Sequence, residues 1–175
     1  MQPAGPERSP GAPAAATVIV RTAGAADLEF IRVLCRQLFL EFGSYDRYVE
    51  DWFGEKIVST GIAEADSARA GFFMLAIHPP AVETDPAVGE LLAIAVLPEL
   101  QSKGIGLALL DRALALARES PREVHEVRLS VAEGNARAQR MFARRGFRVG
   151  SAAGIYPAGQ RALFMTKVLK KEGRE

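Results

Sequence analysis

The 175-residue sequence has few of the residues from which several kinds of site are built. It contains one cysteine, Cys35, so neither an internal disulfide nor a cysteine-rich zinc site can form. Its two histidines, His78 and His125, are too few for a histidine-based metal cluster. We therefore expect a protein without a bound metal.

Long apolar runs are missing as well. No stretch approaches the roughly 20 apolar residues that are needed to cross a bilayer. Residues 1–16 are rich in Pro, Gly and Ala and lack the apolar segment of a signal peptide, which predicts a cytoplasmic protein with no membrane partner. Because they also lack bulky apolar side chains, residues 1–16 are expected to form a disordered tail, and the charged residues 170–175 a frayed one.

The net charge is only +1, but the charges are unevenly distributed. The first hundred residues hold 7 Lys and Arg against 14 Asp and Glu, whereas the rest of the chain holds 15 against 7. A chain polarised in this way can present one region that attracts anions and another that attracts cations. The alternative is that the exposed surfaces of its helices differ by chance.

Between residues 17 and 169, segments typical of strands alternate with segments typical of helices. Strands are predicted over residues 17–21, 56–63, 71–78, 90–97, 124–132, 147–151 and 161–169. Helices are predicted over residues 27–42, 48–53, 104–119 and 135–145. Cys35 lies on the apolar stripe of the first helix and is expected to be a core residue. The pattern predicts one α/β (α+β) domain, with a mixed central sheet of about seven strands flanked by about four helices.

The most informative segment joins the apolar strand at 90–97 to an amphipathic helix. Gly104 and Gly106 lie where this helix begins, and glycine lets a backbone approach a ligand closely. The first turn of a helix leaves about four N–H groups unpartnered, at the positive end of its dipole. With the added charge of Lys103, the segment predicts an anion site suited to a phosphate or pyrophosphate.

Two common phosphate-binding motifs do not fit this segment. The P-loop pattern G-x-x-x-x-G-K-S/T is absent, and the dinucleotide pattern lacks its third glycine because Leu109 occupies that position. The alternative is that Gly104 and Gly106 only form a tight turn between strand and helix.

The wider sequence resembles the GNAT superfamily of acetyl-CoA-dependent N-acetyltransferases. The segment matches the family signature Q/R-x-x-G-x-G/A, and a second family pattern, N-x-x-A followed by G-F, lies about thirty residues downstream. The matching residues are Gln101, Gly104, Gly106, Asn135, Ala138, Gly146 and Phe147. Two motifs in the right order and on the right elements are more specific than either motif alone.

The resemblance implies a single GNAT-like domain over residues 17–169 that binds acetyl-CoA as co-substrate. It also implies direct transfer of the acetyl group to a primary amine of a small molecule or peptide. The residues it assigns to the pantetheine arm are Ala95, Val96 and Leu97. Those it assigns to the pyrophosphate are Gln101, Ser102, Lys103, Gly104, Ile105, Gly106 and Leu107, and those near the thioester are Asn135 and Phe142.

The uneven charge fits this interpretation. The family places its acceptor beside the N-terminal part of the chain, where residues 41–64 hold six acidic residues and two basic ones, so a cationic amine is expected. Five arginines between 137 and 148 are interpreted as a solvated helix face, of which one could reach the CoA 3′-phosphate, and no nucleic acid partner is expected. The resemblance leaves a homodimer open.

Acyl transfer needs a neutral amine, but an amine of the lysine kind has a pKa of about 10.4 and is mostly protonated at neutral pH. Glu90 is the candidate for the base that removes the proton. It is the only charge between Asp85 and Glu99, and it lies eleven positions before Gln101, where family members often carry a glutamate base. The alternative is a solvated residue at the start of a strand.

The departing thiolate needs a proton or a hydrogen bond. Many family members supply it with a tyrosine seven residues after the asparagine, where this sequence has Phe142. Tyr156, between the last two strands, is the candidate substitute, although its ring could simply pack in the loop. The missing hydroxyl leaves open a non-catalytic acyl-CoA-binding module or a regulatory protein on the same fold.

Overall fold

The computed structural model describes residues 17–82 and 85–169, so the predicted tails, 1–16 and 170–175, lie outside the described residues. The described part contains seven strands and four α-helices. The strands are β1 (Val18–Thr22), β2 (Val58–Ala65), β3 (Ala68–His78), β4 (Ala87–Val96), β5 (Val124–Ala132), β6 (Arg148–Ile155) and β7 (Arg161–Val168). The helices are α1 (Leu28–Phe39), α2 (Tyr45–Trp52), α3 (Ile105–Glu119) and α4 (Ala136–Arg144), with 3-10 turns at Ala25–Asp27, Leu40–Phe42 and Pro98–Leu100.

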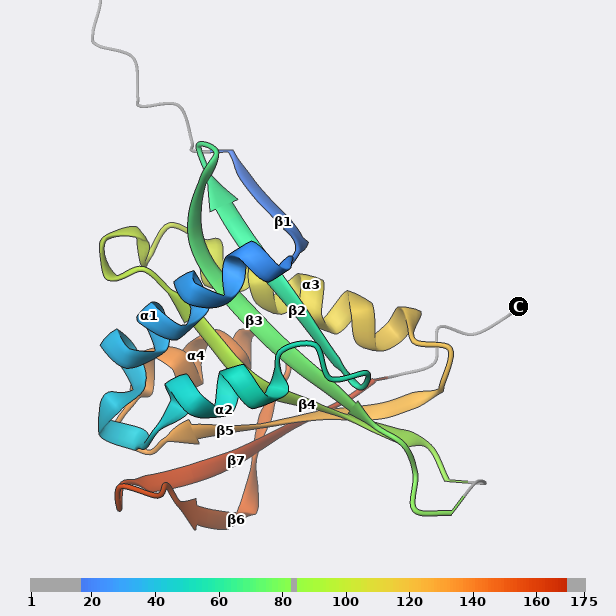
Figure 1. Cartoon of the computed structure of the whole chain (residues 1–175). Helices are drawn as coiled ribbons and strands as arrows, with labels where there is room; N and C mark the ends of the chain where they lie inside the picture. The colour runs from blue at the N-terminus through green and yellow to red at the C-terminus, as the bar shows by residue number, and fades with distance from the viewer. Residues whose placement is uncertain (1–16, 83–84, 170–175) are drawn as a thin grey trace, which may run out of the picture.

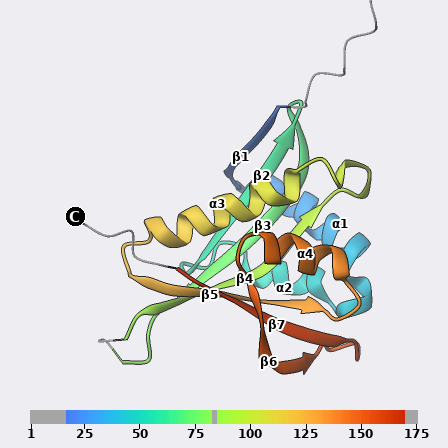
Figure 2. The ribbon, with the colours of Figure 1, turned by 180° about the vertical axis from the view of Figure 1, so that it is seen from behind.

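The strands form one sheet in the order β1-β2-β3-β4-β5-β7-β6. All neighbours pair antiparallel except β4 and β5, which are parallel and are joined by α3. Helices α1 and α2 cover one face of the sheet, and α3 and α4 cover the other (Figures 1 and 2). The predicted α/β architecture with a mixed central sheet is confirmed.

Several predicted boundaries were wrong. The first helix ends at Phe39 rather than at 42, because the chain tightens into a 3-10 turn before Gly43, whose φ of 128° stops it. The second helix begins at Tyr45, three residues early, and β6 runs on to Ile155. Strand β4 begins at Ala87, so Glu90 is its fourth residue and not its first. Pairing with β3 and β5 extends β4 beyond the apolar run that the sequence displays.

Strand β3 separates two apolar cores, because its side chains alternate between the two faces of the sheet. Phe73 and Leu75 pack with residues of α3, whereas Phe72 and Met74 pack with residues of α1. Cys35 belongs to the second core and is 1% exposed, and burial raises the pKa of its thiol to about 12. The prediction that Cys35 is a core residue is confirmed.

An irregularity in β4 shapes the centre of the sheet. Leu91 pairs with Leu75 and Ala93 with Met74, which inserts Leu92 as an extra residue on β4. The bulge changes which face each side chain meets: Leu91 packs in the α3 core, and Ala93 packs in the α1 core. Pairing between β4 and β5 also ends at Leu91, so beyond the bulge the two strands diverge.

Asp27 ties the start of α1 to the first strands. Its side chain is 2% exposed and accepts hydrogen bonds from Arg21 at 2.7 and 3.0 Å, from Arg69 Nε at 2.7 Å and from the Gly24 N–H at 2.8 Å. The hydrogen bonds from Arg21 hold the pKa of Asp27 well below its usual range, against the opposing effect of burial. The buried carboxylate is therefore fully bonded and ionised.

Asp27→Asn is expected to lower the free energy of unfolding by about 2–4 kcal/mol, because it removes the buried charge that holds two arginines. Since the folded pKa lies below the unfolded one, this stabilisation is present above about pH 4 and is lost as the pH falls below that. Urea unfolding at pH 7 and pH 3 measures both effects. The exposed Asp51→Asn serves as the control, and equal stability of the two variants at pH 7 would contradict the assignment.

Candidate functional site

The site begins where β4 and β5 separate. Strand β4 pairs with β3 as far as Val96, but with β5 only as far as Leu91. Beyond Leu91, β4 therefore has no ladder partner on the β5 side, and the carbonyl of Val96 is bonded by a side chain, Gln101, instead of by a strand. An extended ligand with amide groups can bond to such a strand edge as another strand would.

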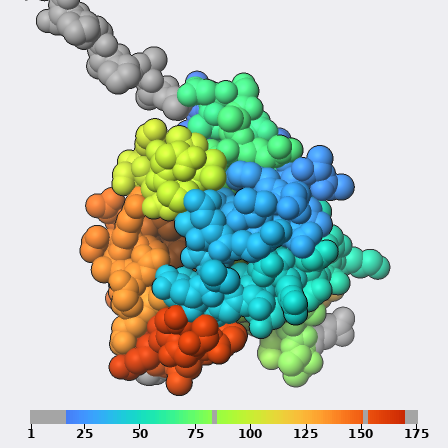
Figure 3. Space-filling view, turned by 60° about the vertical axis from the view of Figure 1, so that its left-hand side comes forward, coloured from blue at the N-terminus to red at the C-terminus, as the bar shows by residue number. Residues whose placement is uncertain are grey.

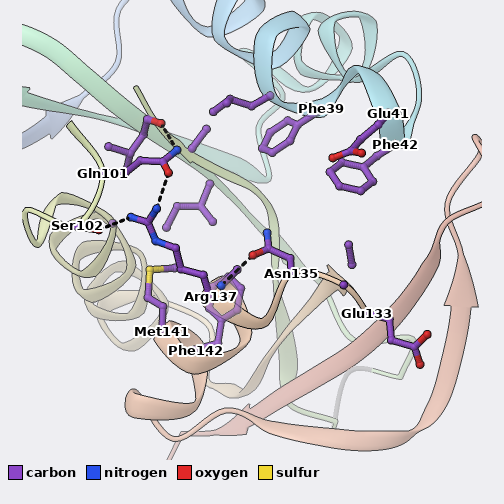
Figure 4. Close-up of a pocket in the computed structure, with 18 of the residues that line it drawn as sticks. Phe39, Glu41, Phe42, Gln101, Ser102, Glu133, Asn135, Arg137, Met141 and Phe142 are labelled. Carbon is purple, nitrogen blue, oxygen red and sulfur yellow. Dashed lines mark hydrogen bonds between the residues drawn. The ribbon is translucent and has the colours of Figure 1, made fainter. Parts of the chain in front are cut away.

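A groove of about 980 Å³ occupies this gap. In Figure 3 it opens where the α1–α2 segment (blue to cyan), the loop before α3 (yellow-green) and the α4 segment (orange) meet. Its lining comes from both diverging strands, from the start of α3 and from α4, with Phe39 and Phe42 on the α1 side (Figure 4). Segments distant in the sequence thus form one continuous surface.

One end of the groove is built from backbone amides. Ser102 and Gly104 have φ angles of 66° and 83°, in the left-handed region, and this turns the chain sharply into α3. Within α3 the first hydrogen bond runs from Ala108 N to Gly104 O at 3.0 Å, so the N–H groups of residues 105–107 are not used by the helix. These N–H groups, at the positive end of a 15-residue helix, suit a pyrophosphate.

Polar side chains connect this loop to α4. Arg137 donates from Nη1 to Gln101 Oε1 at 2.7 Å and from Nη2 to Ser102 Oγ at 3.1 Å. Gln101 Nε2 in turn donates to the Val96 carbonyl at 3.1 Å, where β4 ends (Figure 4). The guanidinium of Arg137 therefore lies beside the amide-lined end of the groove and adds positive charge there.

Gly106 allows α3 and α4 to approach closely. A Cβ at this position would lie 3.0 Å from Met141 Sδ and 3.8 Å from Val96 Cγ2. Both neighbours lie next to or in the groove, so any larger side chain at Gly106 displaces Met141. The close approach explains the need for glycine in the second motif position better than a backbone angle does.

Asn135 has a structural role that leaves part of its side chain free. It is the N-cap of α4, and its Oδ1 accepts from the Ala138 N–H at 3.0 Å. Because the oxygen is used by the cap, the Nδ2 group of Asn135 is available to a ligand in the groove, which it lines (Figure 4).

A smaller cavity of about 90 Å³ continues from the groove between the two strands. Phe142, Asn135, Phe39 and Phe42 line both spaces, whereas Tyr156 lines only the small one. Phe142 is 3% exposed and is packed against the Phe147 ring at 5.8 Å. The structure thus brings Phe142 and Tyr156 to the same cavity.

The ring of Tyr156 packs among aromatic rings of the α1–α2 segment. Its ring centroid lies 5.0 Å from that of Phe42 and 6.4 Å from that of Tyr45. Burial, with a smaller effect of Tyr45, raises the pKa of Tyr156 to about 12. Its hydroxyl therefore keeps its proton at neutral pH and can donate a hydrogen bond.

Glu90 lies outside both spaces, in a neighbouring pocket of about 340 Å³. Its Oε2 is 2.8 Å from His78 Nε2, and the side chain is 48% exposed. Leu91 and Leu92, the next two residues, line the 90 Å³ cavity, so Glu90 lies one step beyond it along β4.

Nine of the twelve residues predicted to bind CoA line the groove, namely Ala95, Val96, Gln101, Ser102, Gly104, Gly106, Leu107, Asn135 and Phe142. The other three do not. Leu97 packs in the α1 core, the side chain of Lys103 is exposed, and Ile105 is 2% exposed in the α3 core, which leaves only its N–H for a ligand. Several other lining residues belong to no motif and were not predicted: Ile94, Glu133, Met141, Gln160 and Arg161.

The negative charge of residues 41–64 is partly neutralised by ion pairs with arginines. Asp46 and Glu50 lie 3.6 Å from arginines of α1, and Glu64 is bonded to Arg21 at 2.7 Å. Glu41 and Glu133, by contrast, line the groove itself. The negative charge available to an acceptor is therefore more local than the sequence indicates.

Among the helices of the described residues, none has the length and apolar character of a membrane span. Within the same part of the chain, no three His, Cys, Asp or Glu side chains are grouped as metal ligands would be.

The sequence model described as the Acetyltransferase (GNAT) family matches residues 28–147. An uncharacterized N-acetyltransferase of Archaeoglobus fulgidus is 37% identical over 82 residues, which are 47% of this chain and 54% of that protein. A mycothiol acetyltransferase of Beutenbergia cavernae is 32% identical over 124 residues, 71% of this chain and 35% of that protein. The chain thus spans about half the length of the first relative and a third of the second.

The fold is similar to that of Arabidopsis thaliana NAA60, whose crystal structure was solved in complex with acetyl-CoA. The two superpose with a TM-score of 0.75 over 87% of this chain and 99% of the other, at 16% sequence identity. At this identity the likeness concerns the fold alone.

Proposed function

The chain belongs to the GNAT acetyltransferase family, and from this membership we propose that it transfers the acetyl group of acetyl-CoA directly to a primary amine. The observation that carries the proposal is the groove, in which an open strand edge leads to a helix start with unused N–H groups. The strand edge suits the amides of a pantetheine arm, and the helix start suits its pyrophosphate. The small cavity at the other end then receives the thioester.

In the proposed reaction acetyl-CoA supplies an activated acyl group, and the protein binds, orients and moves protons. Glu90 accepts the proton that the acceptor ammonium loses, directly or through a water molecule. The amine nitrogen then forms a C–N bond to the acyl carbon as the C–S bond breaks. Tyr156 donates a hydrogen bond or proton to the departing sulfur, in place of the hydroxyl that Phe142 lacks.

The acceptor is proposed to be a cationic primary amine of a small molecule or peptide. Glu41 and Glu133 attract an ammonium to the groove, and the rings of Phe39 and Phe42 offer apolar and cation–π contact beside the small cavity. The 90 Å³ cavity is narrow, which favours an amine on an unbranched carbon.

Thiol release from acetyl-CoA in the presence of a panel of amines tests this function. The panel includes a polyamine, an aminoglycoside, lysine and short peptides with free N-termini. We expect thiol release above the background of hydrolysis with at least one of these amines. Acetyl-CoA binding without thiol release would instead identify the non-catalytic acyl-CoA-binding module, which the apolar Phe142 favours, and failure to bind acetyl-CoA would identify a regulatory protein on this fold.

Tyr156→Phe is expected to lower kcat by about tenfold, because it removes a hydroxyl from the cavity that Phe142 also lines. Only a modest loss is expected, since a CoA thiol is already a good leaving group. Phe142→Tyr should restore part of the loss, because both rings line the same cavity. A double-mutant cycle on kcat measures the coupling. Strictly additive effects would leave Tyr156 as a packing residue.

A further inference from the structure

We propose that His78 is a positioning residue for Glu90 and that its charge sets the lower edge of the pH range in which the protein transfers acetyl groups. The inference rests on the proposed function and on Glu90 as its base. It is carried by a contact that the pattern of the sequence does not show: His78 Nε2 and Glu90 Oε2 are 2.8 Å apart.

The register of the sheet produces this contact. His78, the last residue of β3, pairs with Val88 of β4, so Glu90 is its diagonal neighbour. Along β3, His78 lies on the same face as Phe72 and Met74, which pack against α1. Before the bulge in β4, Glu90 lies on the face of Leu92, which packs in the same core. Both side chains therefore emerge on the α1–α2 face, from which Phe39, Phe42 and Tyr45 also line the small cavity.

The other charged or titratable groups near the pair come from three elements. Arg128 of β5 is the register partner of Glu90, but its guanidinium is bonded to Glu126. Asp85, in the connection between β3 and β4, lines the same pocket. Tyr45 of α2 also lies near Glu90. Burial first, and then neighbouring groups including Glu90, raise the pKa of Tyr45, so its hydroxyl stays neutral. Among these neighbours in the described residues, only His78 is hydrogen-bonded to Glu90.

The contact does two things for a general base. An N–H donated by Nε2 holds Oε2 and restricts a side chain that is otherwise half exposed, which leaves Oε1 to accept a proton. A histidine side chain can be neutral or positively charged, and the two forms act differently on a bonded carboxylate. An imidazolium bonded to the carboxylate makes it a weaker base, whereas a neutral imidazole holds it without this effect.

It follows that transfer rises with pH as the imidazole loses its charge. His78→Gln keeps an N–H donor near Nε2 but cannot become charged. His78→Ala removes both the donor and the charge. His125 is exposed at the start of β5 and does not line the pocket of Glu90, so His125→Gln is a matched control.

The experiment measures kcat/KM of each variant relative to the wild type from pH 5.5 to 8.5, with one amine that is acetylated. The ratio cancels the titration of the acceptor amine, which all proteins share. For His78→Gln we expect a ratio within about threefold of one at pH 8.5 that rises at least tenfold toward pH 5.5. For His78→Ala we expect the same slope and a ratio about five- to tenfold lower throughout, because the carboxylate is no longer held.

A flat ratio for His78→Gln, like that of His125→Gln, would overturn the role of His78 while leaving acetyl transfer intact. A slope that persists when His78→Gln is placed in a Glu90→Gln background would also overturn it, because His78 would then act without Glu90. Failure of the wild type to release thiol with any amine removes the proposed function itself, and the role of His78 with it.

Discussion

Replacing Gly106 with valine is expected to weaken acetyl-CoA binding at least about 100-fold, roughly 2.7 kcal/mol. The added Cβ meets Met141 Sδ at 3.0 Å, so the larger side chain displaces Met141, which lines the groove. The valine side chain also blocks the N–H groups of the first turn of α3, and each charge-assisted hydrogen bond lost there is worth about 1.5–3 kcal/mol. Isothermal calorimetry with acetyl-CoA measures the loss.

Two comparisons separate blocked binding from misfolding. Ser102→Ala removes only a hydroxyl that accepts from Arg137, so it should bind acetyl-CoA nearly as the wild type does. Gly106→Val should unfold within a few degrees of the wild type, because the atom it displaces is the end of a flexible side chain. Wild-type affinity in a folded Gly106→Val protein would show that CoA does not bind at the start of α3.

Glu90→Gln is expected to lower kcat about 100-fold and to leave acetyl-CoA affinity nearly unchanged. The amide keeps the shape of the carboxylate and can still accept from His78, so the substitution removes the base and little else. Affinity should persist because Glu90 does not line the groove. Steady-state thiol release with a saturating amine gives kcat, and calorimetry gives the affinity.

Glu55 is exposed, so Glu55→Gln is the matched control for the loss of one negative charge. Its kcat should equal that of the wild type. In the Glu90→Gln protein the acidic limb of the pH profile should also disappear, since the carboxylate on which the charge of His78 acts is gone. An unchanged kcat across the pH range would return Glu90 to the role of a solvated strand residue and would move the search for the base to the small cavity.

Much of the fold and one half of the site followed from the sequence alone. The seven strands and four helices were predicted, because apolar periodicity and glycine stops act within a few residues of the chain. The amide-lined loop was predicted for the same reason: Gln101, Gly104 and Gly106 lie within six positions, and the helix that follows starts where its pattern starts. Helices, strands and a loop of this kind depend on residues that are close together in the sequence, so the sequence predicts them.

The tertiary structure alone decided which distant residues meet. It brought Tyr156 into the cavity of Phe142, placed Arg137 against Ser102, and paired His78 with Glu90. These contacts depend on strand register, on the bulge at Leu92 and on the divergence of β4 from β5. A one-residue change of register turns a side chain to the opposite face of a sheet, and only the packing of both cores against β3 and β4 fixes that register.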